Sequence, residues 1–260
     1  MSIRKRISAL FNEVRLLIRF GFRKIGVSGY QLHQIELNSE QLIYLPIPKN
    51  ACSTIKHALY EIEYGKEFDY DQAREWGYQD IHDYYNKRKS AFTGTKALKK
   101  KDATIFTVIR EPVKRLISCY RNRVVDLRDL EKNKSALHRR NLPLEPDLNT
   151  FVIRLEEYRE ANKSIEHHSR PQHLFLGDRL DYIDEVFPLH QMKEVKAMLK
   201  ELKPGLKMRA EKSGGTTFGL TDLSITALDE AIRFYENDYD LLSDYYSPNK
   251  IREVYHESAT

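Results

Sequence analysis

The most restrictive feature of the sequence is a short apolar run that two prolines end and that a helix pattern follows at once. The run covers residues 41–48, Gln-Leu-Ile-Tyr-Leu-Pro-Ile-Pro, and predicts a short buried strand. From Ser53 onward, apolar residues recur with helical spacing, and Gly65 is suited to end that helix. The apolar positions are Ile55, Ala58, Leu59 and Ile62. The segment therefore predicts a strand, a tight loop and a helix.

A second unit of the same kind begins at residue 103. Residues 103–109 form an apolar run that leads directly into Arg110-Glu111-Pro112, and we expect a strand parallel to the first. Pro112 suits the first turn of a helix, whose buried face would carry Leu116, Ile117 and Tyr120.

The rest of the chain continues the alternation. The pattern predicts a helix over residues 149–162, a strand over 182–187, and helices over 191–202 and 225–235, the last leading into an aromatic tail. Residues 127–148 are polar and contain Pro143 and Pro146, so we expect an insert there. Strands that alternate with helices predict an α/β fold: a single domain over residues 31–260, with a P-loop-like, mostly parallel sheet flanked by helices.

Residues 1–30 differ from this domain in charge. Residues 1–24 contain seven Lys and Arg residues and a single acidic residue, Glu13, and apolar residues lie between the cations in the sequence. Three interpretations stay open: a solvated terminal helix, a helix that docks on a protein partner, and an amphipathic segment in peripheral contact with an anionic membrane.

Hydropathy and cysteine content limit the cellular compartments in which the protein is expected. No apolar run approaches the roughly 20 residues of a membrane span, and no cleavage-site pattern follows Leu16-Leu17-Ile18, so we expect no secretory signal. Cys52 and Cys119 are the only cysteines, which suits a reducing environment, and we interpret both as packing residues. We expect a cytoplasmic protein, and membrane contact through residues 1–24 would place it on the inner face of the membrane.

The loop between the first strand and its helix has the character of an anion site. A helix start offers unpaired N–H groups and a positive dipole end, and this loop adds the charge of Lys49 and the hydroxyls of Ser53 and Thr54. The loop contains no glycine, so the G-x-x-x-x-G-K-[ST] pattern is absent, and no Asp follows a strand in a position to hold Mg²⁺. A nucleotide triphosphatase is therefore disfavoured, and no metal is expected.

Two motifs together resemble the PAPS-dependent carbohydrate sulfotransferases, including the Golgi chondroitin and dermatan enzymes and their bacterial relatives. Pro48-Lys49-Asn50-Ala51-Cys52-Ser53-Thr54-Ile55-Lys56 is similar to their 5′-phosphosulfate loop, P-K-x-A-C-T-N-x-K. Residues 110–120, which run from Arg110 to Tyr120, are similar to their 3′-phosphate motif, R-D-P-x-x-R-L-x-S-x-Y. Weaker similarity continues through residues 168–173, through Lys212-Ser213 and through the Tyr-x3-Asp-Tyr pattern at 235–239.

This resemblance implies a function and a set of roles. The donor would be 3′-phosphoadenosine-5′-phosphosulfate (PAPS), and the acceptor a hydroxyl of a glycan or glycolipid, sulfated by in-line transfer. Lys49 would stabilise the leaving oxygen, Ser53 and Thr54 would hold the 5′-phosphate, and Arg110 with Ser118 would hold the 3′-phosphate. The full set of implied donor-binding residues is Pro48, Lys49, Asn50, Ala51, Cys52, Ser53, Thr54, Arg110, Ser118, Lys212 and Ser213.

The sequence departs from the family pattern in two places. Glu111 stands where the family has Asp, and Ser53-Thr54 stands where it has Thr-Asn. Singly, Lys49, Arg110 and Ser118 could be ordinary surface or structural residues, and only their joint occurrence within two motifs favours the functional interpretation.

The base that accepts the proton of the acceptor hydroxyl is a histidine or a carboxylate. We rank His168 as the first candidate for this base and His82 as the second, with Glu111 and Asp83 as outsiders, that is, less favoured candidates. The cations among residues 121–140, namely Arg121, Arg123 and Arg128, either attract an acidic glycan or form a solvated helix face.

Two other classes of protein stay open. A catalytically idle relative would bind the nucleotide without transfer. A nucleic-acid-binding protein would fit the net charge of +5, but 38 acidic residues dilute the positive charge and no standard nucleic-acid motif is present, so no nucleic-acid partner is expected.

Overall fold

The computed structural model of the chain describes residues 32–37, 41–88, 90–92, 103–208 and 217–259. The segment 1–30 and the pair Lys212-Ser213, both singled out above, lie outside the described residues. The described part, from Leu32 on, forms one compact unit. None of its helices is long and apolar enough to cross a membrane.

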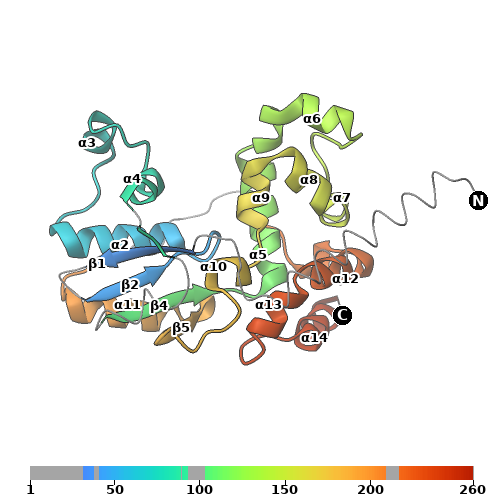
Figure 1. The fold of residues 1–260 in the computed structure, drawn as a ribbon. Coiled ribbons are helices and arrows are strands. Elements are labelled where there is room, and N and C mark those ends of the chain that lie inside the picture. The colour runs from blue at the N-terminus through green and yellow to red at the C-terminus, as the bar shows by residue number, and fades with distance from the viewer. Residues whose placement is uncertain (1–31, 38–40, 89, 93–102, 209–216, 260) are drawn as a thin grey trace, which may run out of the picture. The chain divides into compact units, whose positions relative to one another are not determined.

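A five-stranded sheet forms the centre of the fold (Figure 1). In spatial order its strands are β3 (Ser90–Phe92), β1 (Leu32–Leu37), β2 (Leu42–Leu45), β4 (Thr104–Ile109) and β5 (Glu185–Pro188). The strands β2, β4 and β5 are parallel neighbours, whereas β1 pairs antiparallel with both β2 and β3. Four strands therefore run in one direction and β1 runs in the other, so the expected mostly parallel α/β sheet is confirmed.

Alternating side chains of β2 and β4 divide the apolar core between the two faces of the sheet. Tyr44 and Phe106 stack with ring centroids 4.9 Å apart and pack with α2 (Cys52–Tyr64) and α11 (Met192–Leu202). On the other face, Ile43 and Ile105 pack with side chains from α10 (His173–Leu176) and α13 (Glu236–Leu241). Burial on both faces explains why these strands are continuous apolar runs.

The two predicted strand–loop–helix units are present. The first joins β2 to α2, which ends at Gly65 in the left-handed conformation that glycine adopts freely. The second joins β4 to α5 (Pro112–Cys119), whose first residue is Pro112. The helix α5 continues without a break into η3, a π-helix over Tyr120–Asp126.

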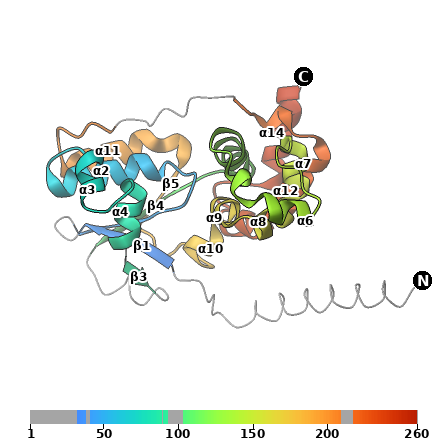
Figure 2. The same ribbon diagram turned by 90° about the horizontal axis from the view of Figure 1, so that it is seen from above.

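Helices around α5 form a second apolar cluster (Figure 2). They are η4 (Asp129–Asn133), α6 (Lys134–Arg139), α7 (Leu148–Ile153), α8 (Leu155–Ala161), α9 (Lys163–Ser169), α12 (Ile225–Phe234) and α14 (Pro248–Ala259). The polar stretch 127–148 joins this cluster, because Leu130, Leu137 and Leu142 are buried in it.

Several elements differ from the sequence-based expectation. The single helix expected over residues 149–162 is interrupted at Arg154, whose guanidinium bonds to the carbonyls of Arg140 and Asn141 and to Glu157. The aromatic tail forms α13 and α14. Neither β1 nor α3 (Tyr70–Glu75) nor α4 (Ile81–Arg88) was expected, and His82 therefore lies on a helix. The remaining elements are the short turns η5 (Leu189–Gln191) and η6 (Leu220–Asp222).

Asn162 anchors α9, the helix that carries His168. Its Oδ1 accepts from the N–H groups of Ser164 and Ile165, and its Nδ2 donates to the carbonyl of Asp129 and to Asn133 Oδ1.

We expect Asn162→Ala to lower the free energy of unfolding by about 2–3 kcal/mol, because it removes a cap and leaves buried groups unpaired. Urea denaturation measures this. The exposed cap variant Asp69→Ala is the control, and an equal loss in the two variants would contradict the expectation.

Candidate active site

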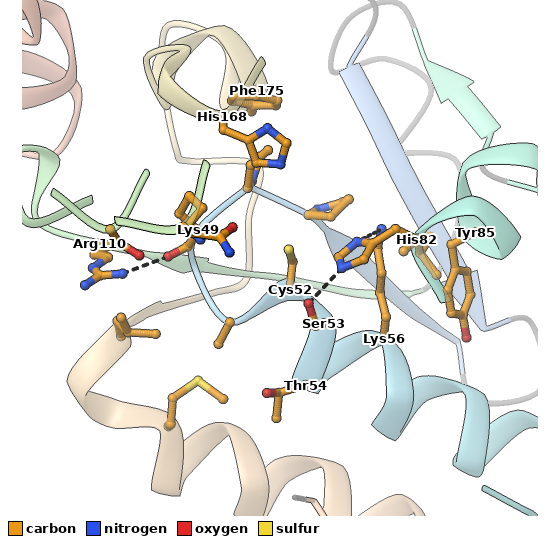
Figure 3. Close-up of a pocket in the computed structure, with 18 of the residues that line it drawn as sticks. Lys49, Cys52, Ser53, Thr54, Lys56, His82, Tyr85, Arg110, His168 and Phe175 are labelled. Atoms are coloured by element: carbon orange, nitrogen blue, oxygen red, sulfur yellow. Dashed lines mark hydrogen bonds between the residues drawn. The ribbon is translucent and has the colours of Figure 1, made fainter. Parts of the chain in front are cut away.

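A cavity of about 910 Å³ opens where β2 and β4 end. Most of the residues from Pro46 to Thr54, except Ile47 and Asn50, contribute to its wall, as does Arg110 after β4, together with side chains from α4, α5, η3, α9 and α11. Figure 3 shows Lys49, Cys52 and Ser53 at its centre, His168 and Phe175 on one side, and His82 and Tyr85 on another. The carboxyl ends of parallel strands are where α/β proteins bind their ligands.

The loop from β2 to α2 has an unusual backbone. Lys49 and Ala51 have φ angles of 70° and 57°, in the left-handed region that costs a non-glycine residue about 1 kcal/mol or more. Ala51 supplies no side-chain cap, and the first turn of α2 contains no acidic residue. The positive end of the helix dipole therefore faces the cavity without a negative side chain of its own helix to offset it.

Two cations of the loop region are held close together. Lys49 Nζ donates to Asn122 Oδ1 at 2.8 Å, and Arg110 Nη1 donates to the carbonyl oxygen of Lys49 at 3.1 Å. Burial lowers the pKa of Lys49 to about 8, and the charges of Arg110 and Arg123 add to this effect. Burial and the neighbouring Arg115 lower the pKa of Arg110 to about 10. The site thus holds positive charge in partly desolvated form.

Gln172 joins the two motifs through buried hydrogen bonds. Its Oε1 accepts from Asn50 Nδ2 at 2.7 Å and from the Arg110 N–H at 3.1 Å, and its Nε2 donates to the Arg110 carbonyl at 2.7 Å. Asp238 accepts from the Gln172 N–H at 2.8 Å. Asn50, Gln172 and Asp238 all have zero exposure. The side chain of Asn50 therefore supports the loop from behind and does not line the cavity.

Arg115 is a second support beneath the loop. Its guanidinium donates to the carbonyl of Pro48 at 2.9 Å and to the carbonyl of Arg170 at 2.8 Å, and it is fully buried. No acidic side chain in the described part of the chain forms an ion pair with it. The guanidinium therefore ties the loop of Lys49 to the segment that follows His168.

The two candidate bases occupy different positions in the cavity wall. His168 Nδ1 lies 2.8 Å from the carbonyl oxygen of Ser164, so this nitrogen carries the proton and Nε2 is left as an acceptor. Burial and the charge of Arg123 lower the pKa of His168 to about 3. His82 instead lies between Ser53 and Lys56, with Nε2 2.7 Å from Ser53 Oγ and Nδ1 3.1 Å from Lys56 Nζ.

Most of the residues that the sequence singled out lie around this one cavity. Its wall includes Pro48, Lys49, Ala51, Cys52, Ser53, Thr54, His82, Arg110, Ser118 and His168. Among the outsiders, Asp83 instead pairs with Lys87, and Glu111 accepts from the Lys114 N–H and the Tyr239 hydroxyl. Arg121 and Arg128 do not line the cavity, whereas Arg123 does.

Sequence reasoning missed several cavity residues. They are Lys56, Asn122, His167, Phe175, Lys193 and Lys196. Two of them had a signal, since Asn122 lies one helical turn beyond Ser118 and Lys56 closes the first motif. Arg123 was one of the three cations considered for an acidic acceptor, and it reaches the cavity from a π-helix, whose wider turn the sequence pattern did not indicate.

Neither cysteine forms a disulfide. Cys119 is buried, and burial raises the pKa of its thiol to about 11. Among the described residues, no group of His, Cys, Asp and Glu side chains gathers in an arrangement that could hold a metal ion.

The fold and the cavity define an α/β protein whose strand–loop–helix unit presents cations and a helix start to the cavity. A family model described as the sulfotransferase family matches residues 37–246, most of the chain, and the protein belongs to that family. No curated protein and no solved structure matches the chain significantly.

The lowered pKa of Lys49 makes a prediction for stability. Unfolding restores the ordinary Lys49 pKa of 10.5. Between about pH 8 and 10.5 the unfolded chain therefore binds more protons than the folded protein does. The free energy of unfolding consequently rises as the pH rises through that window. Lys49→Met removes the buried charge. We expect the variant without ligand to be about 1–2 kcal/mol more stable than the wild type below pH 8.

This difference should disappear by about pH 10.5. Urea unfolding at pH 7, 8.5 and 10 measures it, with Lys114→Met as the control for loss of an exposed lysine. A pH-independent difference between Lys49→Met and the wild type would contradict the assignment.

Proposed function

We propose that the protein transfers the sulfuryl group of PAPS to a hydroxyl of a carbohydrate, either a glycan or a glycolipid. One observation carries the proposal: the Lys49 loop with its helix start, and the pair Arg110 and Ser118, line the same cavity. Two anion-binding groups in the wall of one cavity suit a nucleotide with a phosphate on both its 3′ and 5′ positions.

The donor fits this cavity in one orientation. The 5′-phosphosulfate lies against the start of α2, where Ser53 and Thr54 offer hydroxyl donors, and the 3′-phosphate lies against Arg110 and Ser118. The side chains of Leu189, Met192 and Met208 form an apolar part of the wall and suit the adenine base. Specificity for PAPS over nucleotides without a 3′-phosphate then depends on Arg110.

The transfer step is an in-line displacement at sulfur. The acceptor oxygen forms a bond to sulfur while the bond from sulfur to the bridging phosphate oxygen breaks, and 3′-phosphoadenosine-5′-phosphate (PAP) leaves. Negative charge gathers on that bridging oxygen, and the ammonium of Lys49 stabilises it. Catalysis in such a step is mostly positioning and electrostatic stabilisation, by analogy with phosphoryl transfer.

His168 is the base that receives the proton of the acceptor hydroxyl. Its Nδ1–H is engaged by the Ser164 carbonyl, so the lone pair of Nε2 is the available acceptor. A pKa of about 3 is low for a base; burial is its largest cause, and the charges of Arg123 and Lys49 lower it further. A polyanionic donor bound beside these cations offsets their charge and raises the proton affinity of His168.

The carbohydrate acceptor is the part of the proposal that rests on the two motifs alone. Phe175 and His167 line the wall near His168, and aromatic faces suit the apolar faces of sugar rings. The catalytically idle relative remains the alternative, and it differs from the enzyme in turnover but not in nucleotide binding.

The role of Arg110 is tested by comparing two nucleotides. PAP at 100 times its dissociation constant should stabilise the wild type by about 2.7 kcal/mol, whereas adenosine 5′-monophosphate should bind far more weakly. Arg110→Ala should weaken PAP binding by about 10–100-fold and remove most of the preference between the nucleotides. Thermal shift and calorimetry measure this, with Lys114→Ala as the control. Failure of PAP to bind the wild type would refute the donor assignment.

Turnover separates Lys49 and His168 from residues that only bind. With radiolabelled PAPS and a panel of glycan and glycolipid acceptors, Lys49→Ala should lower kcat by about 10²–10³-fold, and His168→Ala by about 10²–10⁴-fold. The affinity for PAP should change only a few-fold in both. If the wild type binds PAP but sulfates no acceptor, the idle-relative interpretation is correct. A loss confined to PAP affinity would overturn both role assignments.

A further inference from the structure

Three side chains form a continuous hydrogen-bonded chain beside the loop of Lys49. Lys56 Nζ lies 3.1 Å from His82 Nδ1, and His82 Nε2 lies 2.7 Å from Ser53 Oγ. Lys56 and Ser53 are on α2, His82 is on α4, and all three line the cavity (Figure 3). Lys56 is only 5% exposed. These bonds therefore connect a buried ammonium to a hydroxyl in the cavity.

The direction of the protons in this chain follows from its first member. An ammonium group has three donors and no acceptor, so Lys56 donates and His82 Nδ1 accepts. The proton of the neutral imidazole is then on Nε2, and Nε2–H donates to Ser53 Oγ. A doubly protonated ring would direct a second N–H at the ammonium, which the 3.1 Å distance forbids. Since Ser53 Oγ accepts from His82, its own proton is available to a further acceptor.

We propose that His82 is a positioning residue that directs the hydroxyl proton of Ser53 at an oxygen of the donor's 5′-phosphosulfate, and that it is not the base. This inference rests on the proposed function, because it names the role of a residue in the same site. All three bonds run one way, from Lys56 through His82 and Ser53 to the ligand. A phosphate or sulfate oxygen is an acceptor that completes the chain.

The same geometry excludes His82 from proton abstraction. Its Nδ1 lone pair is occupied by Lys56, and its Nε2 already carries a proton. His82 would have to break one of these bonds before it could accept a proton from the acceptor hydroxyl. The ammonium of Lys56 also polarises the imidazole, which strengthens the Nε2–H donor and in turn the Ser53 hydroxyl.

A double-mutant cycle tests whether His82 acts through Ser53. Ser53→Ala should weaken PAP binding about 10-fold, the loss of one hydrogen bond to a charged group, and His82→Ala about 3–10-fold. In the Ser53→Ala background, His82→Ala should cause no further loss, because the hydroxyl that it positions is gone. Calorimetry with PAP measures all four affinities. Additive losses would overturn the proposal. His57→Ala, a histidine of α2 outside the cavity, is the control.

The conservative variant separates a positioning role from a catalytic one. Gln places an N–H at the position of Nε2 and an oxygen within reach of Lys56, so His82→Gln should keep PAP affinity and kcat within about 3-fold of the wild type. A base replaced by Gln loses about 10²–10⁴-fold in kcat, and that result would refute the inference. The thermal midpoint of each variant reports whether it is folded.

The tautomer of His82 is measured without any nucleotide. In the full-length protein with labelled histidine, two-bond ¹H–¹⁵N spectra should show the Nε2–H form of His82, and Lys56→Met should remove the preference for it. An Nδ1–H or doubly protonated ring at neutral pH would overturn the inference even if PAP binds. If PAP does not bind but the Nε2–H form is present, the proposed function fails while the chain geometry stands.

Discussion

The rest of the site depends on two hydrogen bonds that the fully buried guanidinium of Arg115 donates. It bonds to the carbonyls of Pro48 and Arg170, so one side chain from α5 fixes both the loop that carries Lys49 and the segment that follows His168. Pro48 and Arg170 are more than a hundred residues apart in sequence. Burying a cation whose hydrogen-bond acceptors are neutral carbonyls lowers the free energy of unfolding. We interpret the retention of Arg115 as a sign that it fixes the geometry of the site rather than adding to stability.

The cost of this cation is part of a wider pattern of accumulated positive charge. Burial is the main cause of the lowered pKa values of Lys49 and Arg110; the charges of Arg110 and Arg123 add to it at Lys49, and the charge of Arg115 adds to it at Arg110. Two left-handed residues in the loop add backbone strain. An anionic ligand in the cavity would offset part of the charge penalty, and this would contribute to its binding.

The parts of the fold that could be predicted are those that local sequence determines. The apolar runs at 42–45 and 104–109 and the helices after them have patterns of their own, as does Pro112 at a helix start. Glu111 caps α5 through the Lys114 N–H, so the change from Asp preserves the cap. The Asn50–Gln172 bond joins residues 122 positions apart, and the bond from Ser53 to α4 depends on a helix that was not expected. Such contacts exist only after the chain has folded.

The two histidines show why tertiary contacts decide roles that sequence leaves open. Both line the cavity, and from sequence either could be the base. Their hydrogen-bond partners separate them, because His168 donates from Nδ1 to a carbonyl whereas His82 accepts at Nδ1 from an ammonium. In His168 the Nε2 atom therefore has a free lone pair, whereas in His82 the Nε2 atom carries a proton. One ring is therefore suited to take a proton from the acceptor, and the other to direct one at the donor.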